Sequence, residues 1–185
     1  MSAVPVVATA TFPDVFILPS GTRLVLRAVE RADRERIHAL FRRLGEESRY
    51  RRFLSPKREL SQPELAYLSD IDHFSHEAIA AVDRRDGSFA GVVRVIRRTD
   101  WWEAADMAIE VADDLQHMGI GSCLTARMLE RAREIHFTAL TATTLRENAA
   151  ARRLLKRFGF TPIASTGREI EFERELGFTG GTLAA

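Results

Sequence analysis

Two glycines separated by one residue, Gly119 and Gly121, stand where an apolar, strand-like run gives way to a helical pattern. The first amides of a helix have no partner within it, and the helix dipole adds positive potential there. Glycine lets an anion approach this backbone closely, so the turn is suited to hold a phosphate. A tight turn that only closes against a sheet is the alternative, and it is the commoner reason for an isolated Gly-x-Gly.

Two nucleotide-binding motifs are excluded by the residues that follow this turn. The dinucleotide motif needs a third glycine at position 124, which is Leu here. A P-loop needs Gly-Lys-Ser/Thr, and no such triplet follows. Both nucleotide-binding interpretations are therefore poor.

Two carboxylates, Asp106 and Glu110, precede the turn in a run of alternating residues. Residues four apart on a strand share a face, while Met107, Ile109 and Val111 share the opposite one. A carboxylate that reaches a substrate can act as a general base. The alternative for both residues is a solvated strand face or a salt bridge.

Composition limits the partners of this 185-residue chain. With 45% hydrophobic and 29% charged residues it fits one globular domain. The formal net charge of +1 implies no general attraction to nucleic acid or to a membrane surface. The N-terminus has no basic region ahead of its apolar residues, so we expect no signal peptide and a cytoplasmic location.

Cysteine and histidine usage gives no support for a metal site. The single cysteine, Cys123, excludes a disulfide framework and a cysteine cluster, and a small core residue is the expected role for it. Asp72, His73 and His76 are loosely spaced, and a role in a loop or at a strand edge is expected for them. We therefore predict no bound metal.

The pattern along the chain predicts an α+β domain with a mixed sheet and helices on both faces. Asp86-Gly87 marks a hairpin, and the strand-helix-strand unit over 104–145 should be parallel within a mostly antiparallel sheet. We expect a lead-in at 1–20, the domain at 21–176 and a flexible tail at 177–185. Strands are predicted at 22–29, 76–83, 89–96, 104–111, 137–145 and 168–175, and helices at 31–44, 60–71, 119–136 and 148–160.

Two motifs in this framework resemble those of the GNAT N-acetyltransferase family. The stretch QHMGIG, residues 116–121, is similar to the family signature Gln/Arg-x-x-Gly-x-Gly/Ala, and NAAARRLLKRFGF resembles its second cofactor motif. The predicted element order is also similar to the family fold, over roughly residues 22–175. SRYRRF, ELAYLSDIDHFSHEAIAAV and ADMAIEVADDLQ look like the acetyltransferase domain of bacterial protein lysine acetyltransferases.

The resemblance implies that acetyl-CoA is the co-substrate. Its pantetheine arm would run along the strand end, and its pyrophosphate would lie on the amides of the turn. Asn148 would contact the cofactor arm, although it is equally suited to cap the helix that it begins. The cofactor-binding residues implied in this way are Val111, Ala112, Gln116, His117, Met118, Gly119, Ile120, Gly121, Ser122 and Asn148.

The resemblance also implies direct attack of an amine on the thioester in a ternary complex. A protein lysine is the preferred acceptor, with a small-molecule amine or a protein N-terminus as the alternative. Asp106 aligns with the general-base glutamate of the lysine acetyltransferases, and Glu110 is the second candidate. Leu155 stands where many members carry a tyrosine that protonates the leaving thiolate, so no general acid is assigned.

Two alternatives stay open at this point. A non-catalytic acyl-CoA-binding sensor would also suit the missing tyrosine and the atypical pair His117 and Met118. A homodimer is possible as well. In the resembling family the region of ESRYRRF forms the acceptor wall, and a solvated helix end is an equally good interpretation.

Overall fold

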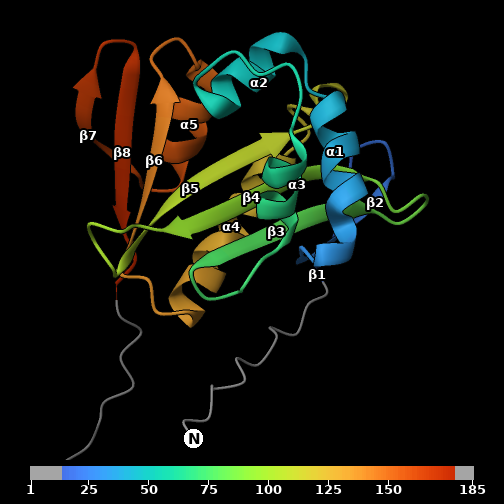
Figure 1. Cartoon of the computed structure of the whole chain (residues 1–185), viewed down its shortest axis with the longest axis horizontal. Coiled ribbons are helices and arrows are strands. Elements are labelled where there is room, and N and C mark those ends of the chain that lie inside the picture. Colours follow the sequence, from blue (N-terminus) through green and yellow to red (C-terminus); the bar gives the residue numbers. More distant parts are fainter. Residues whose placement is uncertain (1–13, 178–185) are drawn as a thin grey trace, which may run out of the picture.

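The computed structural model describes residues 14–177, which form one sheet with helices on both of its faces (Figure 1). The described strands follow the order β1-β2-β3-β4-β5-β6-β8-β7. They are β1 (Asp14–Ile17), β2 (Arg23–Ala28), β3 (His76–Asp83), β4 (Phe89–Arg97), β5 (Ala104–Val111), β6 (Ala139–Leu145), β7 (Thr161–Thr166) and β8 (Glu169–Glu175). Only β5 and β6 run parallel among them.

Two apolar clusters lie on opposite faces of this sheet. One packs α4 (Ile120–Glu134) and α5 (Ala149–Arg157) against the strands, around Leu124, Met128 and Leu155. The other packs α1 (Arg34–Arg42) and α3 (Gln62–Ser69) against the opposite face, around Ile37, Leu40 and Leu65. The predicted α+β class with helices on both faces is confirmed.

Local signals explain why several elements begin and end where they do. The Ser61 side chain accepts the Glu64 amide while Glu64 accepts the Ser61 amide, a capping box that starts α3. The β3–β4 hairpin turns through Gly87 at φ 72°, a conformation that favours glycine. The remaining short elements are two 3-10 turns, η1 (Arg31–Asp33) and η2 (Asp113–Leu115).

The sheet opens between β5 and β6. These strands pair over only three positions, from Ala104 opposite Ala139 to Asp106 opposite Thr141. Beyond that point β5 stays paired with β4, and β6 stays paired with β8. In Figure 1 the two strands diverge toward their carboxyl ends. This opening is where a ligand can enter the sheet.

Apart from the short turn η2, three of the described elements were not predicted. Part of the expected lead-in forms β1, which pairs with β2, whereas residues 1–13 and 178–185 lie outside the described residues. Strand β7 carries Pro162 and a register shift beside it, and both obscure the alternating pattern. Helix α2 (Glu46–Phe53) has no buried residue and hence no apolar periodicity. No helix within 14–177 is long and apolar enough to cross a membrane.

Candidate active site

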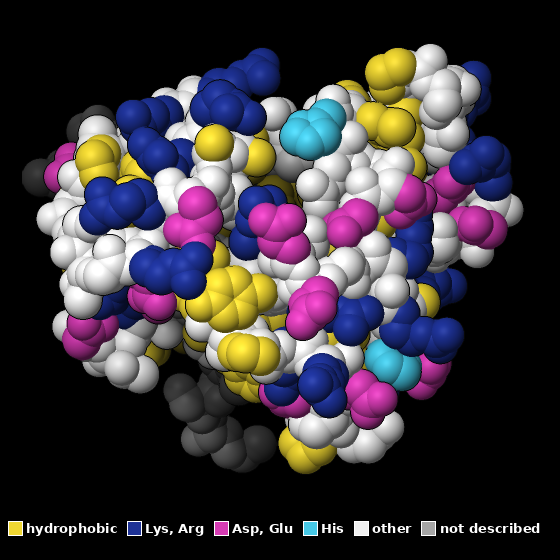
Figure 2. All heavy atoms as spheres, turned by 90° about the horizontal axis from the view of Figure 1, so that it is seen from above, with side chains coloured by type: hydrophobic (Ala, Val, Ile, Leu, Met, Phe, Trp, Pro, Cys, Tyr) yellow, Lys and Arg dark blue, Asp and Glu magenta, His cyan; other side chains and the backbone are white. Residues whose placement is uncertain are grey.

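A cavity of about 620 Å³ lies at the opening between β5 and β6. It is bounded by α2 on one face of the sheet, and by α5 and the start of α4 on the other. Figure 2 views the molecule from this end and shows a hollow near the middle of the face, with Lys and Arg side chains gathered on one side of it. The cavity therefore connects the two faces of the sheet.

The predicted phosphate turn lies on the α4 side of this cavity. Helix α4 begins at Ile120, and its first helical hydrogen bond is donated by the Cys123 amide to the Gly119 carbonyl (3.0 Å). The amides of Ile120, Gly121 and Ser122 thus have no partner within the helix, and no side chain caps this described terminus. All three residues line the cavity. The arrangement provides an uncharged anion site made of backbone.

The two glycines of the turn serve different purposes. Gly119 has φ 88°, a left-handed conformation that other residues rarely adopt. Gly121 is helical, and a Cβ there would lie in ordinary contact, 3.6 Å from Leu154 and 3.7 Å from Ile109. Packing alone does not demand glycine at position 121. Its absent side chain instead leaves the helix terminus open to a ligand in the cavity.

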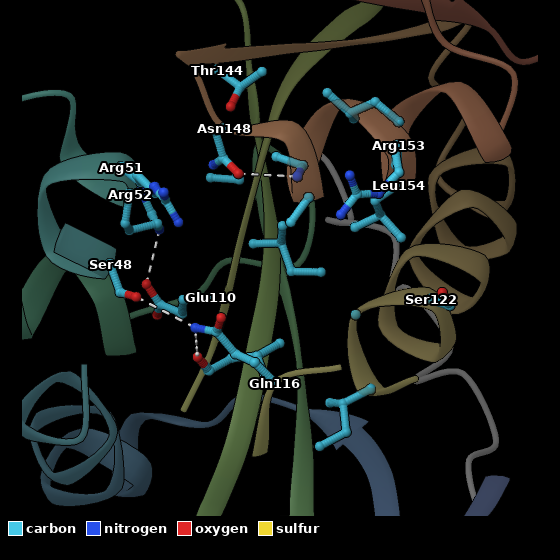
Figure 3. Close-up of a pocket in the computed structure, with 18 of the residues that line it drawn as sticks. Ser48, Arg51, Arg52, Glu110, Gln116, Ser122, Thr144, Asn148, Arg153 and Leu154 are labelled. Atoms are coloured by element: carbon cyan, nitrogen blue, oxygen red, sulfur yellow. Dashed lines mark hydrogen bonds and ion pairs between the residues drawn. The ribbon is translucent and has the colours of Figure 1, made fainter. Parts of the chain in front are cut away.

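Gln116 holds the turn in place through its side chain. Its Nε2 donates to Asp113 Oδ1 (2.9 Å), to the Val111 carbonyl (3.3 Å) and to Ser48 Oγ (3.4 Å). The amide thereby ties the end of β5 and the turn to α2 (Figure 3). His117, with φ 63°, also lines the cavity.

Of the remaining predicted cofactor residues, two line the cavity and two do not. Val111 and Asn148 line the cavity. The Asn148 Oδ1 also accepts the Ala151 amide (3.1 Å), so it caps α5. Ala112 is fully buried with its amide bound to the Ala90 carbonyl, and Met118 packs against the core; neither lines the cavity.

The two candidate base carboxylates have different surroundings. Glu110 lines the cavity, is 8% exposed and accepts from Arg52 Nε at 2.8 Å. Asp106 lies at the last paired position of β5 and β6, is 61% exposed and lies outside the cavity lining. It contacts Arg98 at 3.3 Å and accepts from the Thr141 hydroxyl. Of the two candidates, Glu110 therefore lies in the cavity, whereas Asp106, the residue that the family resemblance favours, lies outside its lining.

A buried guanidinium lies behind Glu110. Arg94 pairs in register with Ala108 and is 1% exposed. Its Nη1 donates to the Leu68 carbonyl (3.2 Å) and to His76 Nε2 (3.0 Å), while its Nε and Nη2 have no partner among the described residues. Burial lowers the pKa of Arg94 to about 10, and the Glu110 carboxylate opposes this shift. Glu110 thus pairs directly with Arg52 and interacts electrostatically with the buried Arg94.

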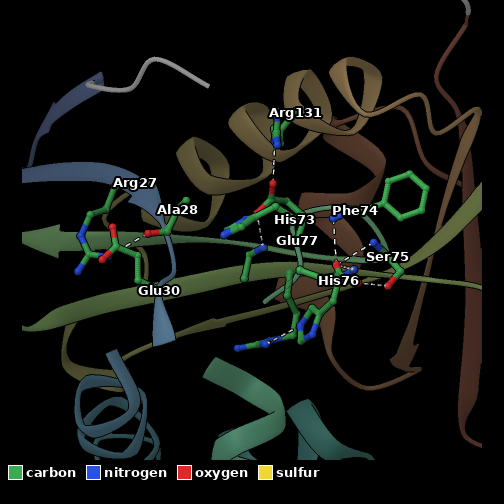
Figure 4. A network of polar contacts seen from close by, with 12 residues as sticks. Arg27, Ala28, Glu30, His73, Phe74, Ser75, His76, Glu77 and Arg131 are labelled. Carbon is green, nitrogen blue, oxygen red and sulfur yellow. Dashed lines mark hydrogen bonds and ion pairs between the residues drawn. The ribbon is translucent and has the colours of Figure 1, made fainter. Parts of the chain in front are cut away.

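The Asp72, His73 and His76 group is engaged in protein contacts (Figure 4). Asp72 accepts the amide of His76 and those of the two preceding residues, and His73 Nδ1 contacts the Glu77 carboxylate at 2.8 Å. Burial and the Arg94 charge lower the pKa of His76 to about 4. Glu77 also accepts from Arg131 Nε at 2.7 Å. These contacts account for the whole group, as the expected loop and strand-edge role implies.

Several cavity residues were missed by sequence reasoning. Arg51 and Arg52 come from α2, the basic and aromatic stretch whose two interpretations were left equal. Arg153 and Arg157 come from α5, within the predicted second cofactor motif, but neither was named as a cofactor-binding residue. Both are exposed, yet they border the cavity. Leu155, at the position where many family members carry a tyrosine, is 4% exposed and belongs to the core.

Comparison with known proteins agrees with this geometry. The protein-family model described as the acetyltransferase (GNAT) domain matches residues 23–161 of this chain. An acetyltransferase of Pseudomonas aeruginosa is 29% identical over 145 residues, which cover 77% of each chain. Acetyltransferase Pat of Mycolicibacterium smegmatis is 29% identical over 140 residues, 76% of this chain but only 42% of that protein.

A solved structure shows the same fold. The crystal structure of the GNAT domain of S. lividans PAT superposes with a TM-score of 0.81 at 24% identity, covering 88% of this chain and 96% of that one. The family match spans most of the described sheet and both cofactor motifs. This chain therefore belongs to the GNAT acetyltransferase family and is an acetyl-CoA-dependent acetyltransferase.

Proposed function

We propose that this acetyltransferase transfers the acetyl group to the side-chain amine of a protein lysine. The observation that carries the proposal is the cavity through the sheet, with a backbone anion site on the α4 side and a carboxylate on the α2 side. The likeness to acetyltransferase Pat of M. smegmatis supports acetyl transfer. The resemblance of SRYRRF, ELAYLSDIDHFSHEAIAAV and ADMAIEVADDLQ to bacterial protein lysine acetyltransferases supports a protein acceptor. The match covers only 42% of the Pat protein, so the likeness concerns its acetyltransferase part alone.

The α4 side holds the co-substrate in this proposal. The amides of residues 120–122 receive the pyrophosphate, and Arg153 and Arg157 add positive charge at the same mouth of the cavity. The pantetheine arm lies along β5, beside Val111. Asn148 borders this path while it caps α5. The residues present are therefore of the kinds that an anionic, elongated co-substrate needs.

The amine enters from the α2 side and must lose a proton before it attacks. A free lysine is mostly protonated at neutral pH, so a base is required. We assign that role to Glu110, which lines the cavity, and keep Asp106 as the second candidate. The neutral nitrogen then attacks the thioester carbonyl, the C–S bond breaks, and the second proton of the nitrogen passes through water to the leaving thiolate. Buried Leu155 supplies no acid for that last step.

The test is thiol release from acetyl-CoA with a panel of lysine peptides, small amines and peptide N-termini. We expect turnover that depends on the lysine side chain, confirmed by the mass of the acetylated peptide. Faster turnover of small amines would contradict the protein acceptor. Binding of acetyl-CoA with no turnover on the whole panel would favour a sensor, the alternative that the missing tyrosine suggests.

A further inference from the structure

The carboxylate best placed to accept the proton is occupied in this structure. Arg52 Nε donates to Glu110 Oε2 at 2.8 Å, and the two side chains are only 14% and 8% exposed. A guanidinium held against Oε2 occupies one of the positions at which an amine N–H would otherwise contact this carboxylate. Arg52 therefore has to release Glu110, at least in part, before an amine can use it.

The entrance on this side is also strongly cationic. Arg51 lines the cavity beside Arg52, and its partner Glu47 is 76% exposed, so that this ion pair is easily exchanged. Buried Arg94 lies behind Glu110. An approaching ammonium meets these cations and one carboxylate that is already neutralised. A lysine with no acidic neighbour is therefore attracted only weakly to this entrance. An acceptor that also carries a negative charge would be attracted to the arginines.

Arg52 is able to take a second carboxylate. Its contact with Glu110 uses Nε alone, and within residues 14–177 its two terminal nitrogens donate no hydrogen bond. A guanidinium that faces a carboxylate with two parallel N–H groups makes a stronger, bidentate pair. In Figure 3 the Arg51 and Arg52 side chains extend from α2 toward the cavity that both residues line.

We propose that the preferred acceptor is a lysine with a carboxylate side chain close to it in the partner, and that this carboxylate draws Arg52 away from Glu110. The exchange breaks no covalent bond: the guanidinium trades one carboxylate for another, and Glu110 becomes free to accept the lysine proton. Arg52 thus determines specificity and positions the base. The inference rests on the proposed lysine acetyltransferase function.

Matched peptides test this directly. Three peptides share one lysine and differ only in the residue two positions away, which is Asp, Asn or Lys. For the wild-type protein we expect kcat/KM to be at least about fivefold higher with Asp than with Asn, the effect of one partly buried ion pair, and lowest with Lys. Arg52→Gln should bring the Asp-to-Asn ratio close to one, and Arg52→Lys should restore part of it. Arg85→Gln, on the distant β3–β4 hairpin, should keep the wild-type ratio.

The failures of the two proposals give different results. Acetylation of all three peptides at equal kcat/KM by the wild-type protein overturns the charge preference and leaves lysine acetylation standing. No acetylation of any lysine peptide, with acetyl-CoA binding intact by calorimetry, overturns both. If Arg52→Gln weakens acetyl-CoA binding but keeps the peptide ratio, Arg52 belongs to the cofactor side and the inference is wrong. If Arg52→Gln folds poorly, Arg52→Lys decides the question. A single ammonium cannot make the bidentate pair with a carboxylate, so its Asp-to-Asn ratio should lie below that of the wild type. An unchanged ratio in Arg52→Lys would contradict the inference.

Discussion

The two sides of the cavity are built in opposite ways. On the α4 side the central polar groups are backbone amides of residues 120–122, in a turn held by Gln116, and the charged Arg153 and Arg157 lie only at the exposed mouth. On the α2 side they are charged side chains, with Arg52 and Glu110 paired above the buried Arg94. A backbone site is fixed by local conformation. A side-chain site depends on which elements the fold brings together.

The difference suggests a division of labour. The co-substrate is the same in every turnover, and a rigid site of unpaired amides suits a constant ligand. The acceptor side has to recognise one amine among many, and side-chain charges can be exchanged or rearranged to do this. Substitutions on the α4 side should therefore change affinity for acetyl-CoA, whereas those on the α2 side should change turnover and acceptor choice.

The largest effect should come from closing the backbone site. Gly121→Val places branched carbons at the open helix terminus, next to Leu154 and Ile109. We expect acetyl-CoA affinity, measured by calorimetry, to fall about 100-fold. The free energy of unfolding should change by less than about 1 kcal/mol, because the glycine is helical. Ala126→Val, on the exposed face of the same helix, is the matched control. Unchanged affinity in Gly121→Val would show that the phosphate binds elsewhere.

The next largest effect concerns the base. Glu110→Gln should lower kcat about 100-fold at neutral pH, the usual contribution of a general base, and leave acetyl-CoA affinity within about twofold. Asp106→Asn should lower kcat by less than about tenfold, because Asp106 lies outside the cavity lining. The reverse order, together with an altered pH–rate profile in Asp106→Asn, would return the role to the residue that the alignment favours.

A smaller effect is expected from the basic residues of α5. The double change Arg153→Gln and Arg157→Gln should raise KM for acetyl-CoA about fivefold and reduce its dependence on salt, because exposed charges attract an anion only through screened electrostatics. Lys156→Gln, on the same helix but away from the cavity, should leave both quantities unchanged. An equal response in the two variants would mean that general charge, rather than position, sets the KM.

The smallest effect should be that of Asn148. Asn148→Ala removes the cap of α5 and should lower the free energy of unfolding by about 1 kcal/mol in a denaturant titration. Asn148→Ser keeps a capping oxygen and should recover most of this loss. If Asn148→Ser is as stable as the wild type but binds acetyl-CoA several-fold more weakly, the side chain contacts the co-substrate as well as capping the helix.

The same contrast explains what the sequence could predict. The α4 side follows from a local pattern of glycines, a helix start and the preceding strand, so its position and most of its residues were predictable. Ala112 was included as the end of the strand beside the pantetheine arm and Met118 for its backbone amide; the structure buries the Ala112 side chain and packs the partly buried Met118 side chain against the core. Helix α2 has no buried face to mark it, and its contact with Glu110 joins residues 58 apart in sequence. Only the fold brings these two side chains together.

The most direct test of this account is a crystal structure of the protein with bound acetyl-CoA. The account predicts pyrophosphate oxygens within hydrogen-bond distance of the amides of residues 120–122, and the pantetheine arm between β5 and β6 with the thioester facing Glu110. A pyrophosphate bound to Arg51 and Arg52 on α2, with the turn before α4 empty, would contradict it.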